Sequence, residues 1–123
     1  MNNNRKYRGI LAVEVITSLF LLILLTAALA TATRFYGYYN RLQLARQQCL
    51  AASQAQLDSI MIQKTLLSQQ DIKRLWPGVK CTVEKQPGQG QWKGLDLYTV
   101  TATAKIRTRS ISIQMKRYIQ HGE

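Results

Sequence analysis

The amino-acid sequence predicts an α+β fold in which a long N-terminal helix packs on a small three-stranded antiparallel sheet. Three observations lead to this prediction. A continuous apolar run, from Ile10 to Ala32, lies near the start of the chain, and a helical apolar stripe follows it. From Val79 onward the apolar residues instead alternate with polar ones. The chain has 123 residues, which is enough for one small domain and an appendage.

The apolar run is long enough to cross a membrane as a helix. Residues 10–32 contain neither proline nor glycine, and a helix of that length measures about 34 Å against a hydrocarbon core of ~30 Å. A helix is the structure that a single segment adopts in lipid, because it pairs its backbone groups internally. We therefore predict a transmembrane helix over residues 10–33.

Beyond the apolar run, the helix is predicted to continue in amphipathic form to about Met61. The aromatic stretch Phe35–Tyr39 suits a membrane interface, where aromatic rings are favoured. The stripe that follows has steps of three and four residues and should face the sheet. Its positions are Phe35, Tyr38, Leu42, Ala45, Cys49, Ala52, Gln56, Leu57 and Ile60.

A short second helix is predicted over residues 65–75. Ser68 is placed to cap it, with Asp71 three residues further on. The sequence Trp76–Gly78 then ends the helix, because proline removes a backbone donor and glycine admits a positive φ.

Three strands, each with one apolar face, are predicted in the remainder of the chain. The first begins at Val79, and a loop at Gln86–Gln91 leads to the second at Leu95–Ile106. A turn at Arg107–Arg109 leads to the third, which ends at about Ile119. Such a succession of strands indicates an antiparallel meander with one face on the core.

One acidic residue, Glu14, lies inside the apolar run. A charge at the centre of a membrane-spanning helix costs on the order of 2.5–3.5 kcal/mol, and less near the interface. An ionisable residue in such a segment therefore indicates a function and a partner. A short basic leader with Arg5, Lys6 and Arg8 precedes the run and ends at Gly9, five residues before the acid.

This order of basic leader, Gly9, four apolar residues, Glu14 and apolar helix resembles the class III signal of type IV pilins and type II secretion pseudopilins. The resemblance implies that a prepilin peptidase cuts after Gly9 and methylates Ile10. It also implies that the freed α-amine of Ile10 pairs with Glu14 of a neighbouring subunit and sets the register of packed helices. Two features depart from the family: the segment reads Ile-Leu-Ala-Val-Glu where Phe-Thr-Leu-Ile-Glu is usual, and Thr31 stands where many pilins have proline.

The resemblance implies a minor pilin-like structural subunit with a leader at residues 1–9, a transmembrane helix at 10–33 and a pilin-like domain at 34–123. Its partners would be sister pilins or pseudopilins, the prepilin peptidase, an inner-membrane assembly platform and a cytoplasmic ATPase. The expected location is the inner membrane, with the N-terminus cytoplasmic before processing and the C-terminal domain periplasmic or extracellular. Small size and the stretch Leu50–Ile60 are similar to the I-type minor pseudopilins of type II secretion and to related minor pilins.

The two cysteines fit the predicted packing. Cys49 is on the helix stripe, and Cys81 is on the apolar face of the first strand. A bridge between them would close a loop of about thirty residues and add ~3–4 kcal/mol in the chain-entropy model. It would also indicate an oxidising compartment. The alternative is a pair of unlinked thiols that behave as small apolar side chains.

The sequence offers little for catalysis or for a metal or cofactor. The single histidine, His121, lies in a polar tail, and a Ser–His–Asp or Cys–His arrangement would need one in the core. The acids Asp58, Asp71, Glu84 and Asp96 are separated along the chain, and there is no glycine motif for phosphate. We expect neither an enzyme nor a metal site.

Two alternative functions stay open, one from the charge balance and one from the apolar run. Lys and Arg number 17 against 6 acids, which gives a net charge of +11 and an attraction for anionic partners. A DNA-binding minor pilin of a DNA-uptake system is one alternative, since phosphate contacts need only clustered cations. The candidate contacts are Lys105, Arg107, Arg109, Lys116 and Arg117. The other is a small secreted binding module whose apolar run is a signal peptide, cleaved near Thr31 or Thr33.

Overall fold

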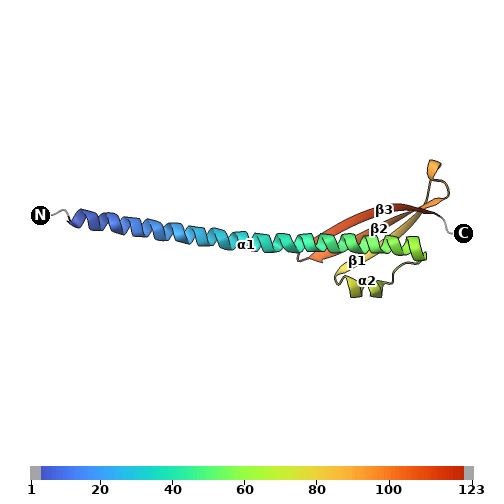
Figure 1. The fold of residues 1–123 in the computed structure, drawn as a ribbon, viewed down its shortest axis with the longest axis horizontal. Helices are drawn as coiled ribbons and strands as arrows, with labels where there is room; N and C mark the ends of the chain where they lie inside the picture. Colours follow the sequence, from blue (N-terminus) through green and yellow to red (C-terminus); the bar gives the residue numbers. More distant parts are fainter. Residues whose placement is uncertain (1–3, 121–123) are drawn as a thin grey trace. The chain divides into compact units, whose positions relative to one another are not determined.

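The computed structural model describes residues 4–120 (Figure 1). Residues 1–3 of the predicted leader and the tail that contains His121 lie outside this range. The elements in chain order are α1 (Asn4–Gln63), α2 (Gln69–Leu75), β1 (Val79–Pro87), the 3₁₀ turn η1 (Gly90–Trp92), β2 (Leu95–Ile106) and β3 (Arg109–Gln120). The predicted α+β class is confirmed, because the chain has one long N-terminal helix that packs on a three-stranded antiparallel sheet of order β1-β2-β3.

The chain divides into two compact units, with the boundary between residues 39 and 40. The described part of the first unit is the N-terminal portion of α1, whose large apolar side chains from Ile10 to Leu29 are all 52–67% exposed. A continuous apolar surface of this kind is typical of a helix that meets lipid or other helices. By its length and its composition, α1 is able to cross a membrane.

The threonine hydroxyl groups in the apolar half of α1 are satisfied within the helix. Four threonine side chains donate to backbone carbonyls three and four residues earlier, at 2.7–3.1 Å. They are Thr17, Thr26, Thr31 and Thr33. Such back-bonding removes the free hydroxyl donors from the helix surface, which suits a segment without water around it.

The second unit contains the C-terminal part of α1, α2 and the sheet. Lys64 has φ 54° and follows the last residue of α1. The backbone N–H of Asp71 donates to Ser68 Oγ at 3.1 Å, and that hydroxyl donates to the Asp71 carboxylate at 2.7 Å. The predicted cap is confirmed, but the prediction that the helix starts at residue 65 was wrong, because the cap places the first turn at Gln69.

The register of the sheet decides which side chains face α1. Cys81 of β1 lies opposite Ala102 of β2, which lies opposite Ile113 of β3. Alternate residues along each strand share this face, so that the row on one side of the sheet is apolar and the row on the other is rich in threonine, serine and glutamine. The two-residue turn between β2 and β3 is tight, with Arg107 at φ 51°.

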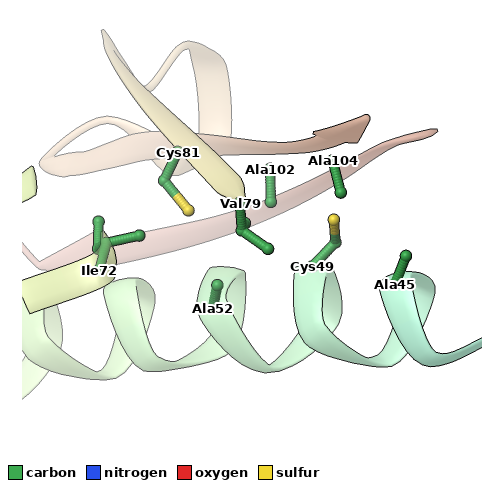
Figure 2. Close-up of a cluster of buried hydrophobic side chains, with 8 residues drawn as sticks. All are labelled: Ala45, Cys49, Ala52, Ile72, Val79, Cys81, Ala102 and Ala104. Carbon is green, nitrogen blue, oxygen red and sulfur yellow. The ribbon is translucent and has the colours of Figure 1, made fainter. Parts of the chain in front are cut away.

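A core of small side chains joins the helix to the sheet (Figure 2). Its buried members are Ala45, Cys49, Ala52, Ile72, Val79, Cys81, Ala102 and Ala104. Small residues on both layers allow the backbones to approach closely. The predicted stripe is confirmed from Leu42 onward, whereas Phe35 is 74% exposed and lies outside the core.

α2 covers one edge of the sheet, and Figure 1 shows it beside β1. Ile72 of α2 is 1% exposed within the core, and the side-chain amide of Gln69 donates to the backbone carbonyl of Cys81 at 3.0 Å. This bond satisfies an acceptor on the outer edge of β1, where no further strand pairs.

Candidate functional site

Gly9, Ile10 and Glu14 lie together on α1. The spacing of four residues between Ile10 and Glu14 places both on the same face of the helix. Glu14 borders two shallow grooves: one is formed with Gly9, Ile10 and Val13, and the other runs along the helix to Leu22. The side chains around the carboxylate are therefore almost entirely apolar.

Among residues 9–120, whose side chains the structure describes, the Glu14 carboxylate has no charged partner. No ion pair or side-chain hydrogen bond in the described part of the chain involves it. The next ionisable side chain toward the C-terminus is Arg34, which at twenty residues is about 30 Å away along the helix axis. An unpaired carboxylate is costly in an apolar medium.

The cysteines are buried in the core as free thiols. Cys49 is 0% and Cys81 is 3% exposed, and the sequence correctly placed both in the core between helix and sheet. The predicted bridge is not found, and the alternative of two unlinked thiols describes the structure. In Figure 2 Cys49 points toward the sheet near Ala104, whereas Cys81 points toward the helix at a different place along it. The structure has no bond between the two sulfur atoms.

Burial raises the pKa of the Cys49 thiol above its ordinary value of 9.0. Burial also raises the pKa of Cys81, and the neighbouring Cys49 adds to that effect. Both groups therefore stay protonated in the folded protein to a higher pH than in the unfolded chain. Their contribution to stability is complete below the ordinary value of 9.0 and is lost as the pH rises through the raised values.

Alkylation of the native protein by iodoacetamide is expected to be much slower than alkylation of the chain unfolded in urea. Burial excludes the reagent, and the raised pKa lowers the fraction of reactive thiolate. Mass spectrometry over time measures the label, and the Cys49→Ser and Cys81→Ser variants assign it to one thiol or the other. Equal alkylation rates in the folded and unfolded states would contradict the burial of the thiols. No labelling in urea without a reductant would contradict their being free.

The structure does not gather the five predicted nucleic-acid contacts into one patch. Lys105 and Lys116 share the sheet face turned away from α1, but they are separated by roughly 20 Å along the strands. Arg117 lies on the other face, where its guanidinium donates to the Asp58 carboxylate on α1 at 3.0 Å. Arg107 is in the tight turn, and Arg109 begins β3 opposite Ile106.

Three acids of the second unit have structural partners. Asp96 is 8% exposed, and its carboxylate forms an ion pair with the Lys85 ammonium at 3.0 Å. The hydrogen bond that Lys85 donates in this pair raises the pKa of Lys85. Asp58 pairs with Arg117, and Asp71 belongs to the cap of α2. In the described range no three histidine, cysteine or acidic side chains come together in a way that could hold a metal ion.

One feature of the surface was missed from the sequence. The loop between β1 and β2 was interpreted as a plain hairpin connection, yet Trp92 in this loop stacks on Tyr118 of β3. The signal available was an exposed aromatic residue in a loop rich in glycine and glutamine. Nothing in the spacing of the two residues indicates that they meet.

Comparisons of the chain with protein families, with curated proteins and with solved structures give no significant match. Its function therefore has to be inferred from its own residues.

Proposed function

We propose that this protein is a minor pilin-like structural subunit, processed after Gly9 and assembled into a short filament of the type II secretion or type IV pilus class. The observation that supports this most is Glu14: a carboxylate without a charged partner among residues 9–120, on an uninterrupted apolar helix, five residues after the glycine. A membrane anchor alone gives no reason for a charge at this position.

Processing would change the electrostatics at Glu14. In the chain as it stands, α1 begins at Asn4 and has no acidic residue in its first turn. Removal of residues 1–9 would bring the helix N-terminus to Ile10 and place Glu14 close to it. A negative charge near a helix N-terminus is stabilised by the helix macrodipole. The freed α-amine of Ile10 on a neighbouring subunit would then supply the cation that the carboxylate lacks.

The proposed topology follows from this assignment. The apolar half of α1 would span the inner membrane, with the N-terminus in the cytoplasm before processing. The second unit would lie in the periplasm or outside the cell. Sister subunits would pack against the apolar helix, while the prepilin peptidase and a membrane assembly platform would act on the chain before and during assembly.

N-terminal sequencing and intact mass measurement of the protein purified from membranes test the proposal. The mature chain is expected to begin at Ile10 and to carry one methyl group. A Gly9→Val variant is the matched control, since a β-branched side chain at the cleavage position should leave the leader in place. A native chain that begins at Thr31 or Thr33 would instead indicate a secreted module, and a functional chain that keeps Met1 would exclude processing altogether.

A further inference from the structure

We propose that the pocket beneath the β1–β2 loop binds a neutral sugar unit of a glycan. This site lies on the sheet face turned away from α1, and it does not depend on the proposed assembly function. Its six lining residues are Gln86, Pro87, Gly88, Gln89, Leu97 and Tyr118.

The loop above the pocket has a defined conformation. The backbone N–H of Gly88 donates to the carbonyl of Leu95 at 2.7 Å, which closes the base of the loop. A Cβ atom on Gly88 would meet the backbone carbonyl oxygens of Trp92 and Leu95, so a larger residue does not fit there. Within the loop, the backbone N–H groups of Trp92 and Lys93 donate to the carbonyls of Gln89 and Gly90 at 3.2 Å. These bonds hold the loop in one shape.

An aromatic stack ties the loop to the far strand of the sheet. The rings of Trp92 and Tyr118 lie with their centroids 4.8 Å apart and their planes at 10°. Tyr118 lies opposite Leu97, and Leu97 lies opposite Gln86, so that the three form one row across the sheet. The loop therefore reaches over β2 to β3, and the pocket lies half open to solvent between this row and loop residues 87–89. Stacking of this kind stabilises the pair beyond the burial of its area, which helps to fix the Tyr118 ring.

The size and the lining of the pocket suit one sugar ring. Its volume is about 320 Å³, at the lower end of the range for small-molecule sites. Leu97, Pro87 and the Tyr118 ring offer apolar surface, whereas the amides of Gln86 and Gln89 each offer donors and an acceptor. A pyranose has the matching shape, with an apolar face of C–H groups and a rim of hydroxyl groups that both donate and accept.

The absence of charge in the lining selects a neutral ligand. None of the six lining residues is Asp, Glu, Lys, Arg or His, although the chain as a whole carries a net charge of +11. The carboxylate of an anionic sugar would find no cation among these lining residues. The basic residues of the last hairpin are not part of this lining.

Titration of the full-length chain with neutral trisaccharides tests the proposal. The chain is held in a detergent without a sugar headgroup, and Trp76→Phe leaves Trp92 as the single tryptophan reporter. Chitotriose, cellotriose and maltotriose are the probes, with trigalacturonate as the anionic comparison. We expect a saturable change in Trp92 fluorescence with at least one neutral probe, and isothermal titration of the unsubstituted chain should give the same affinity.

The matched variants are Gln89→Ala, which removes a lining amide, and Gln91→Ala, which removes an amide of the same loop that does not line the pocket. Loss of the lining amide is expected to weaken binding about fivefold to tenfold, and loss of the other to leave it unchanged. The proposal is overturned if no neutral probe binds saturably, if both variants bind like the parent chain, or if trigalacturonate binds most tightly.

Discussion

A Glu14→Ala chain is expected to be cleaved after Gly9 and inserted into the membrane like the parent chain, yet to be absent from the filament. Cleavage depends on the leader and the glycine, which the substitution leaves intact. In the proposed filament, assembly depends on the pairing of two charges in an apolar medium, and removal of one partner from such a pair costs ~3–5 kcal/mol. This corresponds to a fall in incorporation of on the order of a hundredfold or more.

Incorporation can be measured by co-purification of the substituted chain with its sister subunits from solubilised membranes. Glu14→Gln removes the charge but keeps nearly the same side-chain shape, and we expect this variant to be absent from the filament as well. Ser18→Ala is the control, because Ser18 borders the same groove one helical turn further along and carries no charge. Normal incorporation of both Glu14 variants would remove the role assigned to the carboxylate.

Leu57→Ala is expected to lower the free energy of unfolding of the second unit by about 2–5 kcal/mol. The Leu57 side chain is 1% exposed and is the largest fully buried one on the sheet-facing side of α1. Its truncation leaves a cavity, because the structure around a deleted core side chain relaxes only in part. A unit of this size buries a modest core, so a loss of several kcal/mol is a large share of its stability.

Urea unfolding of the full-length chain, followed by tryptophan fluorescence and circular dichroism, gives the change in free energy. Leu50→Ala is the matched control, since Leu50 is on the same helix but 48% exposed, and we expect a change within about 0.5 kcal/mol. Equal losses for the two variants would show that the sheet-facing stripe does not stabilise the unit as the structure indicates.

The fold was largely predictable because its signals are local. Apolar steps of three and four along α1 and of two along the strands follow from the geometry of each element alone. The cap at Ser68 was also visible, and it fixes the start of α2 better than the extent of the helical pattern did. The burial of Cys49 and Cys81 followed from the same periodicities.

What could not be predicted depends on contacts between elements. That Cys49 and Cys81 stay unbridged depends on how the helix and the sheet pack, which no single segment determines. Lys116 and Arg117 are neighbours in sequence, but the alternation of a strand sends them to opposite faces. The contact of Trp92 with Tyr118 depends on how the loop bends over the sheet. At the candidate site the sequence identified Gly9, Ile10 and Glu14, and their pairing with another subunit stays a prediction.

The alanines that join α1 to the sheet restrict which mutations the lineage can accept. Ala52 and Ala102 are 0% exposed, so nearly every substitution at either position adds volume where there is none to spare. Accepted substitutions at these two positions would then be confined to glycine, serine and cysteine. A larger residue on the helix would require a smaller residue on the sheet, and the reverse. Fluorophores or cross-linkers for following the protein in cells are therefore better attached to the solvent-facing threonines and serines of the sheet.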